Sequence, residues 1–312
     1  MLAGKTLTVS GGTAVFGSGT VLSGSGSITL AGSHTLEIAG DFSHDGSPSV
    51  NFGGAITLTG TNVTADFSNV SVSSLTTLTG GSGDDSVTFA SALGSGTVDL
   101  GTGTDILTLS DSADVLSLSN TETIYAGDGA DQLTYTGSVA TTIKGDLGAD
   151  TLALDGSAAH TVLYFTSSDG GSAGANSGYD TITGFSTSTD TFKVGSALDT
   201  LLDDITSDGS FTFVTDAAAD FSTTHALMVV TGVDDADLVA ASFTNLISTI
   251  NGLGVTSANG DDALIVAQGT TDTAVYYFAE NGSTANNVES GELSLLALID
   301  TALVSTTEIT GS

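Results

Sequence analysis

The chain of 312 residues carries 36 Asp and Glu against three Lys and no Arg, so its formal net charge is -33 at pH 7. Because nucleic-acid phosphates are bound by clustered Lys and Arg, this composition excludes a nucleic-acid-binding protein. A hydrophobic fraction of 39% excludes a disordered acidic tail, and the lack of Cys excludes disulfides and thiolate metal sites. The compact chain repels itself, so we expect cations to offset its charge.

Residues 1–79 contain short alternating apolar runs between Gly- and Ser-rich turns, which is typical of β-strands. We interpret them as coils of a β-solenoid whose turns lack a recurring Asp, and a separate small β-sandwich is the alternative. The N-terminus lacks the apolar core and cleavage site of a secretory signal peptide. No run approaches the roughly 18 apolar residues of a membrane span. The strand-like runs lie at residues 6–9, 27–30, 35–38 and 55–58.

Between residues 80 and 165, large apolar residues head short β-like runs at steps of 8 to 11 residues. This period is too long for one face of a helix and too regular for independent hairpins. It predicts a coil in which each half-turn consists of one short strand and one tight turn. The residues that head the runs are Val87, Val98, Leu107, Leu116, Ile124, Leu133, Ile143, Leu152 and Val162.

The turns of this repeat are rich in glycine and aspartate. Residues 80–88, GGSGDDSVT, match the pattern G-G-x-G-x-D-x-U-x at every specified position, where U is a large apolar residue. Residues 100–108, 126–134 and 145–153 each match it with one glycine replaced. Glycine lets backbone carbonyls point into the turn and the Asp adds a carboxylate, so stacked turns can jointly supply the six to eight oxygens that calcium takes.

The acidic positions of these four segments are interpreted as lying about one full coil apart. They are separated by 20, 26 and 19 residues along the chain. Two intervening half-turns keep an acid at the equivalent place, Asp114 and Glu122. The other half-turns have lost it, so we expect fewer ions than a complete array would hold.

These segments resemble the RTX repeats of proteins exported by type I secretion, whose parallel β-roll binds Ca2+ between its turns. Residues 177–194 resemble the segment that closes such rolls, which implies that Asp180, and with it Asp190, belongs to the last calcium site. The predicted calcium ligands are Gly81, Gly83, Asp85, Gly101, Gly103, Asp105, Gly127, Asp128, Gly129, Asp131, Gly145, Asp146, Gly148, Asp150 and Asp180.

Residues 195–312 lose the nine-residue period. Apolar spacing predicts a helix over residues 235–253, and two apolar runs at 262–267 and 273–278 predict a hairpin. Residues 292–299 suit either a helix or a last strand. The tail resembles the C-terminal module that caps RTX rolls and carries an uncleaved secretion signal, and such a cap is needed because an open solenoid end exposes core and strand edges.

The sequence favours a structural protein over an enzyme. Residues 170–174, GGSAG, match the G-x-S-x-G pattern of hydrolase nucleophiles, but neither a strand nor a helix is predicted around them. The four His residues are scattered, and no pair has the spacing of zinc ligands. We therefore expect no catalytic site.

The predicted fold is all-β: a right-handed parallel β-solenoid, or β-roll, with calcium-binding nonapeptide turns and a mainly β C-terminal cap. Its regions are a solenoid-like part at 1–79, the calcium-binding roll at 80–194 and the cap at 195–312.

The expected function is calcium-dependent self-assembly into an extracellular surface layer (S-layer) or matrix, after export without an N-terminal signal peptide. Other copies of the chain and cell-surface polysaccharide are the expected partners. The alternative is the C-terminal export or binding module of a larger secreted adhesin or hydrolase, and a third hypothesis is a carbohydrate- or ice-binding adhesin.

Overall fold

The computed structural model of the protein describes residues 5–9, 13–16, 20–22, 26–44, 49–164, 166–174, 177–202, 213–221, 227–282, 286–301 and 308–311. Within the predicted cap, residues 203–212, 222–226, 283–285, 302–307 and 312 lie outside this description. The chain forms two compact units, residues 1–144 with 157–159 and residues 145–156 with 160–312. The region boundaries at residues 79 and 194 stay predictions.

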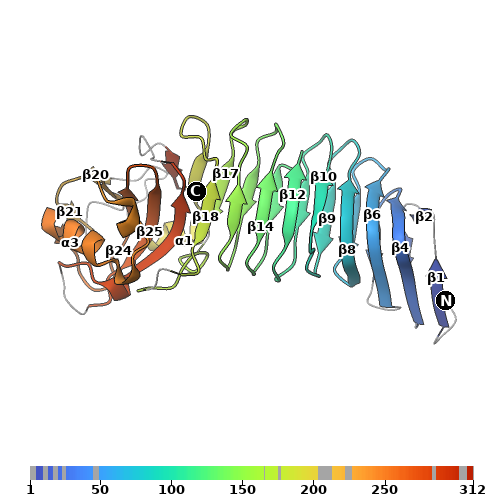
Figure 1. The fold of residues 1–312 in the computed structure, drawn as a ribbon, viewed down its shortest axis with the longest axis horizontal. Helices are drawn as coiled ribbons and strands as arrows, with labels where there is room; N and C mark the ends of the chain where they lie inside the picture. The colour runs from blue at the N-terminus through green and yellow to red at the C-terminus, as the bar shows by residue number, and fades with distance from the viewer. Residues whose placement is uncertain are drawn as a thin grey trace. The chain divides into compact units, whose positions relative to one another are not determined.

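The first unit consists of two parallel β-sheets, which we name sheet I and sheet II, and the chain alternates between them from β3 to β15 (Figure 1). Neighbouring strands in each sheet run parallel, so the unit is a parallel β-solenoid. Sheet I contains β1 (Lys5–Val9), β4 (Gly26–Ile38), β6 (Ser49–Leu58), β8 (Val70–Thr79), β10 (Gly96–Asp99), β12 (Val115–Ser119) and β14 (Gln132–Tyr135), with β2 (Thr13–Phe16) also paired to β4. Sheet II contains β3 (Thr20–Leu22), β5 (Phe42–His44), β7 (Thr64–Phe67), β9 (Ser86–Phe89), β11 (Ile106–Thr108), β13 (Thr123–Tyr125) and β15 (Thr142–Lys144).

The apolar residues of the predicted period point into the fold. Each of them is at most 3% exposed, and within sheet II the members Val87, Leu107, Ile124 and Ile143 lie in register on successive strands. Burying such a side chain contributes about 1.5–3 kcal/mol, so this column stabilises the stack of coils. One period of the apolar spacing therefore corresponds to one half-coil, which consists of one strand and one turn, as predicted.

The coils before residue 80 continue the same solenoid. Strands β4, β6 and β8 pair in parallel with one another, which excludes the separate sandwich. In sheet II, the ring of Phe67 lies between those of Phe42 and Phe89, with its centroid 5.1 Å from each; it is stacked on Phe89 and tilted against Phe42. Aromatic pairs of this kind contribute about 0.5–1.5 kcal/mol each beyond their buried area, so apolar packing stabilises a region whose turns lack the repeated Asp.

The second unit continues with parallel strands and then changes to an antiparallel arrangement. Its larger sheet has the order β16 (Thr151–Ala153), β18 (Asp180–Thr183), β26 (Leu293–Ile299), β25 (Thr273–Ala279), β24 (Asp262–Gln268), β22 (Leu227–Val230) and β20 (Phe213–Thr215). Parallel to one another run β17 (Thr161–Tyr164), β19 (Thr191–Val194) and β27 (Ile309–Thr310), and β21 (Ala219–Asp220) pairs with β23 (Val255–Thr256). The helices are α1 (Ser196–Leu201), α2 (Asp235–Leu238), η1 (Ala241–Phe243), α3 (Thr244–Leu253) and η2 (Ser290–Glu292).

The predicted hairpin is confirmed, because β24 and β25 pair antiparallel along their full length. Of residues 292–299, for which a helix and a strand were both open, residues 293–299 form strand β26 between β25 and β18, and Glu292 ends the short helix η2. Both faces of this strand are buried, so its apolar run is nearly continuous instead of alternating. Among the described residues, no helix is long and apolar enough to cross a membrane.

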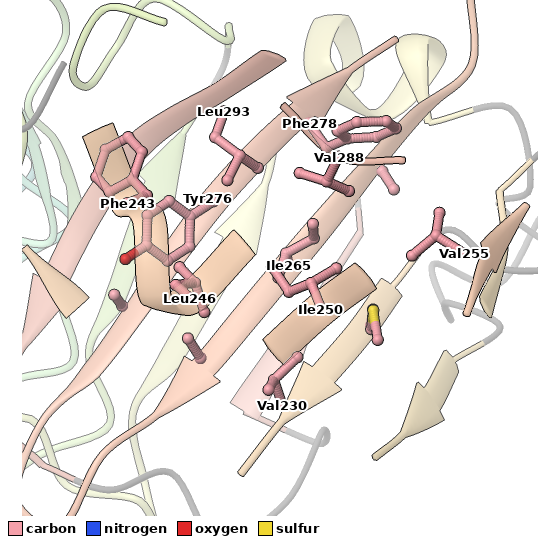
Figure 2. Close-up of a cluster of buried hydrophobic side chains, with 14 of the residues drawn as sticks. Val230, Phe243, Leu246, Ile250, Val255, Ile265, Tyr276, Phe278, Val288 and Leu293 are labelled. Carbon is pink, nitrogen blue, oxygen red and sulfur yellow. The ribbon is translucent and has the colours of Figure 1, made fainter. Parts of the chain in front are cut away.

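The prediction of one continuous helix over residues 235–253 is wrong. Ser242 and Phe243 adopt positive φ angles of 61° and 49°, which ends the helical path between α2 and α3. Phe243 is fully buried and meets the ring of Tyr276 edge-on, with centroids 5.4 Å apart, and the hydroxyl of that tyrosine donates to the carbonyl of Leu238 (Figure 2). Burial of the aromatic ring thus offsets the strain of the left-handed backbone.

The core of the second unit lies between α3 and the β-sheet. Figure 2 shows Ile250 of α3 beside Ile265 of the sheet and Leu246 beside the ring of Tyr276, and these four side chains are fully buried or nearly so. The helical period survives in α3 because only one of its faces meets this sheet.

Two buried carboxyl groups face each other beside this core. Glu280 and Glu292 are 4% and 2% exposed and share a hydrogen bond. The hydroxyl of Ser257 donates to Glu280 at 2.7 Å, and the amides of Asn281 and Glu289 donate to Glu292 at 3.2 and 2.9 Å. Burial, and then the charge of Glu280, raise the pKa of Glu292. Two carboxyls this close cannot both ionise at low cost, so the pair favours the protonated form of Glu292.

This pair predicts that the second unit loses stability at high pH. Because the pKa of Glu292 is raised in the folded state, its contribution is complete at low pH and is lost as the pH rises through the raised value. Glu280→Gln replaces one charge by a neutral amide, so we expect a weaker pH dependence of amide-exchange protection over residues 257–299, measured at pH 5 and 8 in saturating calcium. Equal pH dependence in both proteins would contradict this role of the pair.

Candidate calcium-binding corners

The turns that precede the strands of sheet II stack closely on one another. Backbone bridges join Thr61 to Ser82 and Ser82 to Thr102 in parallel, so the corner segments of three coils lie in register. Gly101 has a φ of 92°, and a Cβ placed there would lie 2.2 Å from the carbonyl oxygen of Gly81. A residue with a side chain does not fit this approach, which explains the glycine of the repeat and places carbonyl oxygens against the next coil.

Inside this corner, carboxylates form a ladder from coil to coil, which we name the inner ladder. The amide of Val63 donates to Asp85, the amide of Asp85 donates to Asp105, and the amide of Asp105 donates to Glu122, each at 2.7 Å. Asp85 and Asp105 are 1% and 0% exposed. The corner therefore brings together three of the acids that the repeat predicted.

A second, exposed ladder runs beside the first. The side-chain oxygen of Asn62 accepts from the amide of Asp84 at 2.7 Å, and Asp84 accepts from the amide of Thr104 at 2.8 Å. Sequence reasoning missed Asn62, although its position 22 residues before Asp84 repeats the coil length. The signal was present but weak, since Asn replaces Asp.

The turns before sheet I form an equivalent corner. The amide of Leu93 donates to Asp114, and the amide of Asp114 donates to Asp131 at 2.7 Å. Both acids are 0% exposed. Ser110 adds its hydroxyl to Asp114 at 3.1 Å, and a Cβ on Gly127 would lie 2.3 Å from the carbonyl oxygen of Ser110. The two corners therefore share one construction.

The second unit repeats this arrangement around Asp150 and Asp180. The amide of Asp150 donates to Asp180 at 2.9 Å, and the hydroxyl of Tyr164 donates to the other oxygen of Asp180 at 2.6 Å. Asp190, the other acid implied by the closing segment, accepts from the amide of His160 at 2.8 Å. Sequence reasoning missed Tyr164 as a partner of Asp180, because a tyrosine at an inward position of a strand is expected to be a core residue.

The structure corrects the predicted spacing of the acids. Asp85 and Asp105 precede β9 and β11 of sheet II, whereas Asp131 precedes β14 of sheet I, so the step of 26 residues between Asp105 and Asp131 is not one full coil. The acid one coil after Asp105 is Glu122, 17 residues on. Full coils in this part of the chain thus contain 17 to 20 residues, and the repeat acids divide between two corners, with Asp85, Asp105 and Glu122 before sheet II and Asp114 and Asp131 before sheet I.

The remaining predicted ligands lie in the same turns. Gly83, Gly103 and Gly129 have positive φ angles, and a Cβ on Gly103 would lie 2.3 Å from the carbonyl oxygen of Gly83. Gly145 is buried, and a Cβ there would lie 2.4 Å from an oxygen of Asp150. Asp128 is exposed, as Gly103 is, while Asp146 and Gly148 are partly exposed, as Gly83 and Gly129 are. Of the predicted carboxylate ligands, Asp128 therefore lies on the outside of its turn.

The buried acids are electrostatically costly as ions. Burial raises the pKa of Asp105 to about 6 against the hydrogen bond from Asp85, and the charges of Glu122, Asp85 and Asp84 add to the rise. Burial likewise raises the pKa of Asp114, and it raises that of Asp180 well above the usual range. One oxygen of Asp105, Oδ2, is buried and has no hydrogen-bond partner among the described residues. A cation beside these oxygens would remove both the desolvation cost and the repulsion.

No protein-family model and no curated protein matches this chain. The site must therefore be judged by its own chemistry. Within the described part of the chain, no three acidic or His side chains converge in the way a metal ion held by side chains requires. The donors that the corners do combine are stacked backbone carbonyls and single carboxylates, which are hard oxygen ligands. Such a set fits calcium and does not fit zinc, which takes four N, S or carboxylate ligands.

Proposed function

We propose that the chain is a calcium-dependent extracellular structural protein, and that Ca2+ at the corners holds its coils together. The observation that carries this proposal is the inner ladder, in which buried Asp85, Asp105 and partly exposed Glu122 succeed one another without a basic side chain between them. The orphaned Oδ2 of Asp105 points to a ligand other than protein. The resemblance of the turns to RTX repeats agrees with this reading.

The residues of the corners would have two different roles in binding calcium. Asp85, Asp105, Asp131, Asp150 and Asp180 would supply carboxylate oxygens, and the glycines of the same turns would leave their carbonyls accessible by avoiding a Cβ. When bound, calcium supplies positive charge that joins one coil to the next. Because the stacked turns exist only in the folded chain, binding is coupled to folding, so low calcium inside a cell favours the unfolded, exportable chain.

A structural role follows from the same chemistry. The chain has a net charge of -33, and its described residues present acids mostly in turns and corners, so calcium can offset repulsion between copies as well as within one. We therefore infer assembly of many copies at a cell surface or in a matrix, with no catalytic step.

The direct test is the addition of calcium to metal-free protein. We expect monomers in chelator and sheets or filaments at millimolar calcium, seen by electron microscopy and by sedimentation of the same samples. Magnesium at equal ionic strength is the control for simple charge screening, because it binds such flexible oxygen cages poorly. Soluble monomers at millimolar calcium would contradict the assembly part of the proposal.

A further inference from the structure

The two corners differ in how far protein donors satisfy their buried carboxylates. Asp105 and Asp114 are both 0% exposed, and Oδ1 of each accepts from a backbone amide of another coil, that of Asp85 in the first case and that of Leu93 in the second. Their second oxygens are not alike. Oδ2 of Asp105 has no hydrogen-bond partner among the described residues, whereas Oδ2 of Asp114 accepts from the amide and the hydroxyl of Ser110, at 3.2 and 3.1 Å.

The backbone at Ser110 matches that at Gly81 of the glycine-rich repeat. Each of these residues lies four positions before the acid of its turn. A Cβ on Gly127 would lie 2.3 Å from the carbonyl oxygen of Ser110, just as one on Gly101 would lie 2.2 Å from that of Gly81. Residues 110–114 thus place Ser-x-Ser-x-Asp where the repeat has Gly-x-Gly-x-Asp, in the same backbone arrangement.

The turns before sheet II offer no hydroxyl at this position. Gly101, four positions before Asp105, donates its amide to Asp99 at 3.1 Å instead of to Asp105. The amide of Gly81 reaches Oδ2 of Asp85 only at 3.4 Å. A buried carboxylate oxygen that lacks protein donors keeps a desolvation cost, which a bound cation can remove.

We propose that the hydroxyl of Ser110 takes the place of a calcium ion at Asp114, so that this carboxylate needs no ion while that of Asp105 binds one. This inference rests on the proposed function, because it names which corner acids take calcium. A carboxylate oxygen has about two acceptor sites, and two donors already occupy Oδ2 of Asp114. The hydroxyl also lies 3.2 Å from the carbonyl oxygen of Ser112, but a charged carboxylate is the stronger acceptor. An ion at Asp114 must therefore displace hydrogen bonds that an ion at Oδ2 of Asp105 does not meet among the described residues.

The number of calcium ions bound per chain tests this assignment. Ser110→Gly removes the hydroxyl and restores the glycine of the repeat, so we expect this variant to bind one more ion than the unchanged protein. Asp114→Asn should leave the number unchanged, whereas Asp105→Asn should lower it by at least one. Ser112→Gly is the matched control, because Ser112 is exposed in the same turn and its replacement leaves the hydroxyl of Ser110 on Asp114.

Equilibrium dialysis followed by elemental analysis gives the number of ions. Excess magnesium in the buffer occupies the acidic surface without entering flexible oxygen cages well. Circular dichroism in calcium verifies that each variant folds, and if Ser110→Gly or Asp114→Asn does not fold, the other decides. An unchanged number in folded Ser110→Gly, or a loss in folded Asp114→Asn, overturns this assignment and leaves the proposed function standing. Unchanged protein that binds no calcium removes both.

Discussion

Chelation of calcium is expected to unfold the coils of residues 80–190. Without a cation, the buried carboxylates of the corners keep their desolvation cost and mutual repulsion. Each ion present at 100 times its dissociation constant stabilises the folded state by about 2.7 kcal/mol, so two or more such ions would match the roughly 5 kcal/mol at which many domains are stable. Far-UV circular dichroism should lose its β signal in chelator and regain it when calcium is returned.

Identical spectra with and without chelator would show that backbone hydrogen bonds alone satisfy the acids. Magnesium is expected not to restore the signal, because it requires a nearly ideal octahedral shell and dehydrates reluctantly.

The variant Asp105→Asn sharpens this prediction because its effect should change sign with calcium. The amide oxygen of Asn can still accept from the amide of Asp85, while the buried charge disappears. In chelator the variant should therefore unfold at equal or higher urea than the unchanged protein, and in calcium at lower urea. Asp84→Asn, in the turn one coil earlier and exposed, is the matched control and should change little in either condition. An equal loss in both conditions would indicate that Asp105 acts only through its hydrogen bond.

Gly101→Ala is expected to destabilise the solenoid by about 3 kcal/mol or more. The left-handed φ of 92° costs a non-glycine residue about 1–2 kcal/mol, and overpacking typically costs a further 1–3 kcal/mol. Here the added Cβ would lie 2.2 Å from the carbonyl oxygen of Gly81, so the backbone of two coils must separate. Urea unfolding in saturating calcium measures the loss, and calcium titration should show weaker binding.

Gly94→Ala is the matched control for this change. Gly94 is exposed, has no positive φ, and no atom lies within 4 Å of the added Cβ. It should leave stability unchanged or raise it by about 0.4–1 kcal/mol, because alanine restricts the unfolded chain. Equal destabilisation by both variants would contradict the close approach of the corners.

The repeat allowed most of the fold of the first unit to be predicted from the sequence. The column of Val87, Leu107 and Ile124 follows from spacing alone, because a solenoid brings residues one coil apart into contact. The hairpin of β24 and β25 could also be predicted, because both strands and their turn are contiguous in sequence. Local patterns suffice where neighbours in space are also neighbours in the repeat.

The second unit departs from local patterns because tertiary packing overrides them. Helical spacing over residues 235–253 did not reveal the break at Ser242 and Phe243, which burial of the phenylalanine ring stabilises. Residues 292–299 read equally as helix or strand, since a strand covered on both faces has no alternation.

The sequence by itself determined the all-β repeat, the inward apolar column and the glycine and aspartate residues of the turns, because each of these features recurs at a regular spacing. Only the tertiary structure decided that the acids divide between two corners and that Glu122, not Asp131, follows Asp105. Coil length varies between 17 and 22 residues, so counting residues along the chain does not show which acids lie in the same corner. The pairing of the strands shows it.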